Sequence, residues 1–466
     1  MDRPPIDRVV VLMMENGSFD RMVGALADGG RFDGVDFSRP FTNPDPGGGD
    51  IFQAPTESRE IFHDPEHTLP SSLAQYAGGT NRGFVADFAR MYPRATEAER
   101  HEILGVYRRG FLPALHMLAE NFVLCDRWFS SMPGPTWINR LFAHAGSSTG
   151  RVSEPGSLFS AKLHLYDERT LYDELTDAGV DWTIYFGDVP QSLALSHQFG
   201  HLKHYRRFSH FAEDIEKGTL ANYVFIEPTY FGPAQNDQHP PHDVLRGDAL
   251  IAEVYNALRG NPELFAKTLL IVLYDEHGGF CDHVVPPSTI APDDHTKHFG
   301  FDLLGFRVPA VLVSPLLDPG VSSTVFDHTS LLRMASNLFA GVQPLGRRAA
   351  VANDPLAAVT WRSAPRENLP EATIAPDLAE AVREPLLEGL RASLFGLTHH
   401  LESQIESAAH RSALMLRAHE ALGDAWDQAK LATDRLDAWL EHARPHHGVV
   451  GRVGEALGTL RHRVGL

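Results

Sequence analysis

Cysteine and long apolar runs are both scarce in this chain. Only two of its 466 residues are cysteines, Cys125 and Cys281, so a framework of disulfide bonds is implausible. No apolar segment approaches the ~20 residues that a helix needs to cross a bilayer. The chain opens with Met-Asp-Arg-Pro-Pro and enters its first strand directly, which leaves no room for a signal peptide. We therefore expect a soluble, cytoplasmic protein.

Positive charge is also in short supply. The 41 Lys and Arg residues face 60 Asp and Glu residues, which gives a formal net charge of −19 at pH 7. This balance argues against a nucleic-acid partner, because proteins that bind nucleic acids carry basic surfaces. Phosphate substrates stay open, since a bound metal ion can reverse the local field. The length predicts one large α/β domain with an appendage, or two domains.

Two adjacent acids follow one of the most apolar runs in the chain. Residues 269–273 are continuously apolar, as expected of a parallel strand that is covered on both faces. Residues 274–279 follow with the sequence YDEHGG. The carboxylates of Asp275 and Glu276 suit hard-metal or acid–base chemistry, and the two glycines let another group approach closely. The alternative is a strand-to-turn junction whose acids are solvated.

The N-terminus repeats this design. Residues 9–14 form a second apolar run, which ends in Glu15 and Asn16, and Ser18 is a candidate helix N-cap. In open α/β sheets the ligand crevice lies just outside the carboxyl ends of the strands. Two strands therefore deliver oxygen ligands to what could be one edge. Taken alone, the Glu-Asn pair could instead be a capped turn between a strand and a helix.

Three further residues are candidates for nucleophilic or acid–base chemistry. Thr136 lies in residues 133–140, a rigid turn immediately before an apolar helix-like run, so it lies near a helix N-terminus, which favours a phosphate. It could equally be a helix N-cap. His239, in a loop stiffened by prolines, could contact an oxyanion or protonate a leaving group. His67 is the third candidate, and alone it would more often be a turn residue.

Strand-like and helix-like runs alternate along most of the chain, which predicts a mostly parallel, doubly wound α/β sheet. Residues 29–70 are loaded with Gly, Pro and Asp and are expected to be irregular. The expected strands are residues 122–125, 182–186, 223–226, 268–274 and 308–313. The expected helices are residues 112–122, residues 243–258 and a helix that starts near Thr329.

The last part of the sequence has a different composition. We divide the chain into an α/β domain, residues 1–365, and a C-terminal helical region, residues 366–466. Residues 377–443 are rich in Ala, Leu, Glu and Arg with apolar residues at helical spacing. This region is expected to be a helical appendage on the main domain. Homo-oligomerisation and peripheral membrane contact are the alternatives.

Together these segments resemble the phosphoesterase family that contains bacterial phospholipases C and the related acid phosphatases, within the alkaline-phosphatase-like superfamily. The match covers roughly residues 5–345, in the family's order. Gly17 stands where the family usually has Arg, and Ile138 where it usually has Pro, and neither change removes a polar ligand. The matching segments are residues 9–24, 64–84, 133–140, 236–243, 274–287 and 326–330.

The resemblance implies an alkaline-phosphatase-like fold and a metal site. Thr136 would be the nucleophile, forming a phosphothreonine intermediate, and Asn16 would also contact the substrate. His67 and His239 would bind phosphate oxygens or protonate the leaving group, and His204 is expected to bind phosphate as well. An all-oxygen donor set favours hard or borderline divalent ions. The residues implied as metal ligands are Glu15, Asn16, Thr136, Asp275 and Glu276.

The resemblance further implies the reaction. We expect a metal-dependent hydrolase of phosphate esters, most of all a phospholipase C-type phosphodiesterase that acts on phospholipid. A phosphomonoesterase of the acid-phosphatase type is the alternative among enzymes. A catalytically idle relative that serves as a binding or scaffold module is the alternative outside them.

Overall fold

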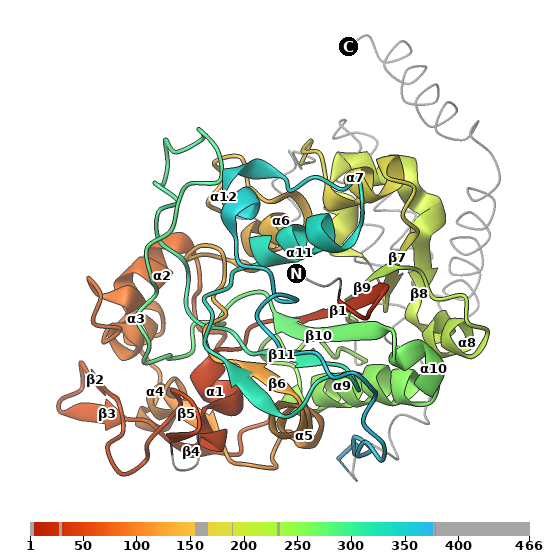
Figure 1. The fold of residues 1–466 in the computed structure, drawn as a ribbon. Helices are drawn as coiled ribbons and strands as arrows, with labels where there is room; N and C mark the ends of the chain where they lie inside the picture. The colour runs from red at the N-terminus through yellow and green to blue at the C-terminus, as the bar shows by residue number, and fades with distance from the viewer. Residues whose placement is uncertain are drawn as a thin grey trace, which may run out of the picture.

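A computed structural model of the protein describes residues 4–27, 30–153, 166–188, 190–230, 234–375 and 378. Its centre is an eight-stranded sheet (Figure 1). In chain order the strands of this sheet are β1 (Arg8–Met14), β6 (Val123–Cys125), β7 (Trp182–Phe186), β8 (Tyr205–Arg207), β9 (Tyr223–Glu227), β10 (Thr268–Tyr274), β11 (Ala310–Val313) and β12 (Gly320–Ser322).

The strand order is β12-β6-β11-β10-β1-β9-β7-β8. Strand β11 pairs antiparallel with both of its neighbours, and every other pair is parallel. The mostly parallel sheet predicted from the sequence is therefore confirmed. Strands β1 and β10 are central neighbours in parallel register, with Met14 opposite Tyr274. All seven residues of β10 are buried, which explains its continuous apolar sequence.

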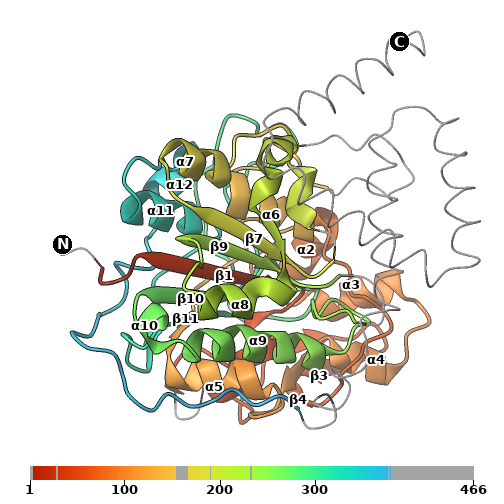
Figure 2. The same ribbon diagram turned by 90° about the vertical axis from the view of Figure 1, so that its right-hand side faces the viewer.

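Helices cover both faces of the sheet (Figure 2). Helices α6, α7, α11 and α12 lie on one face, and α5, α8, α9 and α10 lie on the other. The doubly wound arrangement is thus confirmed for the described residues. These helices are α5 (Pro113–Asn121), α6 (Thr136–Ala145), α7 (Leu171–Asp177), α8 (Phe211–Glu216), α9 (Val244–Arg259), α10 (Pro262–Phe265), α11 (Thr329–Leu338) and α12 (Gly346–Val351).

A peripheral layer lies at the end of the sheet toward which β1 runs (Figure 2). It contains strands where the sequence led us to expect irregular structure, because strands of three residues are too short to leave an alternating pattern. Phe84, Phe88 and Ile103 form part of its own small apolar cluster. Its elements are α1 (Phe19–Val23), β2 (Thr42–Pro44), β3 (Asp50–Phe52), β4 (Ala54–Thr56), α2 (Leu69–Tyr76), α3 (Phe84–Met91), α4 (Glu97–Glu102) and β5 (Gly105–Tyr107).

The packed unit continues past the boundary expected at residue 365. The Tyr255 hydroxyl on α9 donates to the Pro370 carbonyl at 2.8 Å, and the Asn256 amide donates to the Ala372 carbonyl at 2.8 Å. Arg366 donates to the Asn121 carbonyl at 2.6 Å. The helices expected over residues 377–443 lie outside the described residues. Within the described ranges no helix is both long enough and apolar enough to cross a membrane.

Candidate active site at the carboxyl edge of the sheet

The pairing of β1 with β10 brings the two sets of predicted oxygen ligands side by side. The Asp275 amide donates to the Met14 carbonyl at 3.2 Å, and the Gly17 amide donates to the Glu276 carbonyl at 2.9 Å. The Asn16 amide donates to Asp275 Oδ1 at 3.3 Å. The turns after the two strands are therefore held together by backbone hydrogen bonds at one edge of the sheet.

The two glycines after the acids permit this close approach, as the sequence predicted. A Cβ at Gly278 would lie 2.6 Å from the Asn16 carbonyl oxygen, and one at Gly279 would lie 2.7 Å from Pro65 Cβ. Both glycines have positive φ, and Asn16 itself has φ 54°. Asparagine tolerates this left-handed conformation better than most residues, which explains why it can follow Glu15 at the sharp turn.

Several polar atoms at this edge are buried and have no partner among the described residues. They are Oδ1 and Nδ2 of Asn16 and Oε1 of Glu276. The other Glu276 oxygen accepts from the Gly278 amide at 2.7 Å. Leaving a buried polar group unsatisfied costs about 1–3 kcal/mol, so such a cluster of orphaned atoms indicates a missing ligand. The unpaired oxygens of the Asn16 amide and the Glu276 carboxylate are ligands of the kind that a hard cation prefers.

The pKa values of the buried acids are also consistent with a missing cation. Burial raises the pKa of Glu15, and burial raises the pKa of Asp275 to about 6 even though Arg140 opposes it. Both side chains are nearly inaccessible, with Glu15 4% and Asp275 0% exposed. A divalent cation beside them would favour their charged forms. The donor set at this edge therefore fits the metal that the resemblance implies.

Arg140 links the helix that carries Thr136 to both acids. Its Nε donates to Asp275 Oδ2 at 2.9 Å, and its Nη2 lies 3.4 Å from Glu15 Oε1. Gln191 Nε2 donates to the same Glu15 oxygen at 2.8 Å. Sequence reasoning placed Arg140 in a motif without giving it a role. Its spacing of four residues from Thr136 was the available signal, because such residues share a helix face.

Thr136 lies near a helix N-terminus, as predicted, but it is itself the first residue of α6, so the turn expected over residues 133–140 ends at Pro135. Pro135 occupies the N-cap position, and no side chain forms a cap hydrogen bond there, so the capping alternative is not observed. The turn before Thr136 is fixed by Asn139, whose amide donates to the Gly134 carbonyl at 2.9 Å and accepts from the Met132 amide at 3.1 Å. The Thr136 hydroxyl forms no hydrogen bond with the described residues, including the acids.

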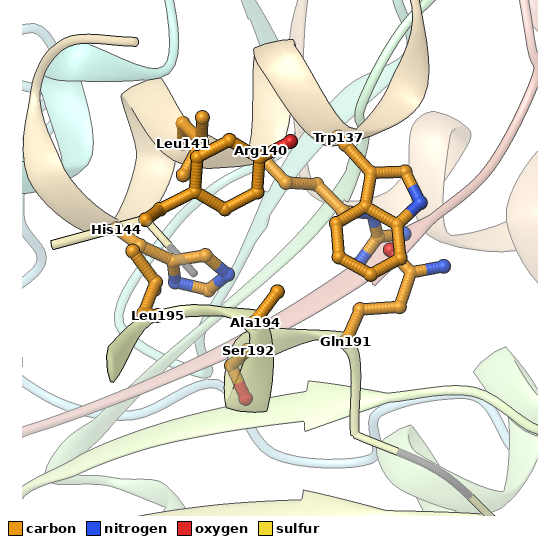
Figure 3. A pocket seen from close by; sticks show the side chains of 9 residues that line it. Trp137, Arg140, Leu141, His144, Gln191, Ser192, Ala194 and Leu195 are labelled. Carbon is orange, nitrogen blue, oxygen red and sulfur yellow. The ribbon is translucent and has the colours of Figure 1, made fainter. Parts of the chain in front are cut away.

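A small recess adjoins this helix (Figure 3). In Figure 3 the Gln191 side chain points toward the Trp137 end of the recess, and His144 lies at the other end. Arg140 lines the recess, and its Nη1 is buried without a partner in the described part of the chain. Burial lowers the pKa of His144 to about 3, so this imidazole is neutral and its Nδ1 pairs with the Tyr172 hydroxyl at 3.0 Å.

The two predicted histidines lie close together. The rings of His67 and His239 are 5.9 Å apart. Burial alone would raise the pKa of Glu276, but the charge of nearby His67 and the Glu276–His277 hydrogen bond outweigh it and lower that pKa. The structure thus brings His67 near one predicted metal ligand, and His239 near His67.

The similarity to known proteins decides the family. The model of the phosphoesterase family matches residues 6–342. The chain belongs to the phosphoesterase family. One relative of this phosphoesterase is non-specific phospholipase C3 of Arabidopsis thaliana, 34% identical over 81% of this chain and 77% of the relative. Another is phospholipase C B of Mycobacterium tuberculosis (strain CDC 1551 / Oshkosh), 30% identical over 71% of this chain and 72% of the relative. The protein is therefore an enzyme that hydrolyses phosphoric esters.

Solved structures resemble the phosphoesterase only distantly. A protein in the alkaline phosphatase superfamily from Vibrio parahaemolyticus covers 76% of this chain and 72% of its own, with 9% identity and a TM-score of 0.36. The lipoteichoic acid synthase LtaP from Listeria monocytogenes covers 75% of this chain and 76% of its own, with 8% identity and a TM-score of 0.35. Similarity at this level identifies neither chemistry nor substrate.

One predicted site residue of the phosphoesterase lies elsewhere. His204 Nδ1 lies 2.7 Å from the Trp182 carbonyl, and the two rings stack at 4.0 Å. Trp182 starts β7 and is in register with Tyr223 of β9. Tyr223 is in turn in register with Val9, at the amino end of β1. Six residues of strand, about 20 Å, separate Val9 from Glu15. We therefore correct the prediction that His204 binds phosphate, because this residue lies at the opposite end of the sheet from Glu15.

A second acidic cluster of the phosphoesterase has a structural role. Metal-ligating atoms of Asp20, Asp282 and His283 lie within 4.8 Å of one another. Arg307 already supplies a cation there, because it donates to Asp20 Oδ1 and to Asp282 Oδ1, each at 2.9 Å. His283 Nδ1 lies 2.8 Å from the other Asp20 oxygen, which also accepts from Gln53 at 2.6 Å. No orphaned oxygen of these two carboxylates remains for an ion.

Proposed function

We propose that this phosphoesterase is a phospholipase C-type phosphodiesterase that uses Thr136 as its nucleophile. The observation that carries the proposal is the set of orphaned oxygens on Asn16 and Glu276, which lies between two strand ends and beside the helix that Thr136 begins. The names of the relatives, phospholipases C from a plant and a bacterium, support the diester substrate. Glu15, Thr136 and Asp275 are all present, which counts against an idle scaffold.

The residues proposed to hold a divalent ion are Glu15, Asn16, Thr136, Asp275 and Glu276. Such an ion would lower the pKa of the Thr136 hydroxyl and offset the charge of the phosphate. Arg140 keeps Asp275 and Glu15 in place through its contacts with both carboxylates. The first-turn amides of α6 have no acceptor within the helix, so they would hold phosphate oxygens.

The reaction would then proceed in two displacements. The Thr136 oxygen attacks phosphorus in line, the bond from phosphorus to the lipid alkoxide breaks, and a phosphothreonine diester forms. A water oxygen next attacks the same phosphorus, the bond to the Thr136 oxygen breaks, and the phosphorylated head group leaves. His67 would bind phosphate oxygens, since its position near Glu276 puts it beside the reacting group.

A comparison of three substrates tests the proposal. We expect p-nitrophenylphosphorylcholine and phosphatidylcholine to be cleaved with a higher kcat/KM than p-nitrophenyl phosphate. A strong preference for p-nitrophenyl phosphate would instead show a phosphomonoesterase. Treatment with a chelator should abolish turnover, and added divalent ions should restore it, because the orphaned oxygens of Asn16 and Glu276 are proposed to hold the ion. Full activity in the chelated protein would rule out the metal site.

A further inference from the structure

The loop over residues 236–243 carries a second histidine, and this loop contacts the strand end that bears Glu15. His242 Nδ1 lies 2.5 Å from Asp237 Oδ1. Asp237 is 2% exposed, and its carbonyl accepts from the Glu15 amide at 3.0 Å. His242 is therefore fixed, through one carboxylate, to the strand end that carries the proposed metal ligands.

Three imidazoles lie in a row here, and their partners differ. His67 Nδ1 lies 2.8 Å from the Pro65 carbonyl, and His239 Nδ1 lies 2.6 Å from the Pro240 carbonyl. The ring of His242 is 6.0 Å from that of His239. His242 thus has a carboxylate at Nδ1, whereas His239 has a carbonyl there. A carboxylate in that place fixes the tautomer and the orientation of the ring.

The surroundings of His239 and His242 also differ. His239 Nε2 lies 3.7 Å from Asp64 Oδ2, so this nitrogen is directed at a protein carboxylate. His242 instead lines a recess that it shares with Asn16, Tyr107 and Phe280. Asn16, one of the proposed metal ligands, lines this recess, so a group that enters it would meet both Asn16 and His242.

We infer that His242 is the acid–base residue of the reaction, with Asp237 as its positioning residue. The inference rests on the proposed function. It assigns the proton transfer to His242 instead of His239. In the first displacement the imidazolium Nε2 gives its proton to the lipid alkoxide as the phosphorus–oxygen bond breaks. In the second, the neutral Nε2 takes a proton from the attacking water, and Thr136 leaves as the alkoxide that began the cycle. Protons and charges therefore balance over one turnover.

Leaving-group dependence tests this assignment, because a nitrophenolate leaves as a stable anion and an alkoxide does not. The full-length enzyme and the variants H242N, H239N and D237N would be assayed on p-nitrophenylphosphorylcholine and on propyl phosphorylcholine. Asparagine keeps a donor for Asp237 but has no Nε2. General acid catalysis contributes about 10²–10⁴-fold, so H242N should lose at least about tenfold more kcat on the propyl ester than on the nitrophenyl ester. D237N should show the same pattern with a smaller loss.

The outcomes separate the inference from the function beneath it. His210, which pairs with Glu213 at 3.3 Å outside the site, supplies the control variant H210N. Equal losses on both esters in H242N, or a leaving-group-dependent loss only in H239N, would overturn the inference alone. A wild-type enzyme that cleaves neither ester would overturn the proposed function and this inference with it. Thermal unfolding of each variant separates loss of an acid from loss of the fold.

Discussion

At the scale of single residues, the site is marked by buried side-chain atoms that have no hydrogen-bond partner among the described residues. Arg140 occupies one oxygen of Asp275, and Gln191 occupies one oxygen of Glu15. Asn16 and Glu276 keep buried atoms without partners. These atoms are clustered at the two strand ends, and a ligand there would offset their cost, so they say more about function than the acids alone.

The Thr136 hydroxyl should be indispensable for turnover but not for folding. Thr136→Val keeps the volume and removes the oxygen, and no cap hydrogen bond is lost. We expect kcat to fall by at least about 10³-fold, as it does when nucleophiles are removed, with the melting temperature little changed. Trapping of a phosphoenzyme by rapid acid quench should succeed in the wild type and fail in the variant. A variant with near-normal kcat would take the nucleophile role away from Thr136.

The close approach at Gly278 can be separated from its backbone strain. Gly278→Ala places a Cβ 2.6 Å from the Asn16 carbonyl at φ +66°, whereas Gly218 has nearly the same φ, +67°, and open space around it. We expect each variant to be destabilised by about 1 kcal/mol or more through strain. Gly278→Ala should be destabilised further and lose activity, because Asn16 must move. Denaturant unfolding and kcat/KM check both points, and equal effects in the two variants would contradict the close approach.

At the scale of elements, two turns are joined by buried ionic contacts beside the site. Asp20 follows β1, and Asp282 and His283 follow β10, while Arg307 precedes β11. Because these contacts fix the turns after both strands, they fix the ligands that those turns carry. His283 also reaches Asp33 with Nε2 at 2.9 Å, which ties in the segment after α1.

This network predicts a loss of stability in alkaline solution. Burial would lower the pKa of His283, but the bond and charge of Asp20 outweigh burial and raise it to about 9. A raised pKa in the folded state gives stability that is complete below about pH 6.5 and is lost as the pH rises through about 9. With ~1.36 kcal/mol per pKa unit, the loss is up to about 3 kcal/mol.

The histidine variant isolates that contribution. His283→Gln should flatten the dependence of the free energy of unfolding on pH between about 6.5 and 9, as measured by urea unfolding across that range. His101→Gln on α4 is the control, because this half-exposed side chain lies outside the network, 3.7 Å from Glu97. An equal slope in the wild type and in His283→Gln would show that the network does not depend on the imidazolium.

At the scale of the whole molecule, the central sheet provides the site and the peripheral layer covers it. Residues 366–375 pack on α9, so the folded unit is longer than the domain expected at residues 1–365. A truncation that tests the C-terminal region should therefore end after residue 378, whose side chain is buried in the main core. An end near residue 366 would remove packing that the α9 face needs.

Removal of residues 379–466 should leave the chemistry intact. We expect kcat/KM on a soluble diester and on phosphatidylcholine vesicles to change by the same factor, because every residue proposed for the chemistry lies before residue 379. Size-exclusion chromatography of both forms checks the alternative of oligomerisation. A loss of activity confined to vesicles would instead assign this region to the lipid surface.

Much of the fold followed from local pattern. The strand over residues 268–274, the helix beginning at Thr136 and the N-cap at Ser18 are where the sequence placed them. Continuous apolar runs, proline turns and capping residues act over a few neighbours, so a sequence displays them directly. The short strands β2 to β5 were missed because three residues carry too little pattern.

The sequence by itself determined that two apolar strands end in oxygen ligands and that a threonine begins a helix. Only the tertiary structure decided which polar groups meet there. Strand register and helix packing bring Arg140 to Asp275, 135 positions along the chain, and loop packing brings Asp237 to Glu15. His204 instead packs against Trp182 at the opposite end of the sheet. Such contacts depend on the summed packing of the whole sheet, and no short stretch of chain encodes them.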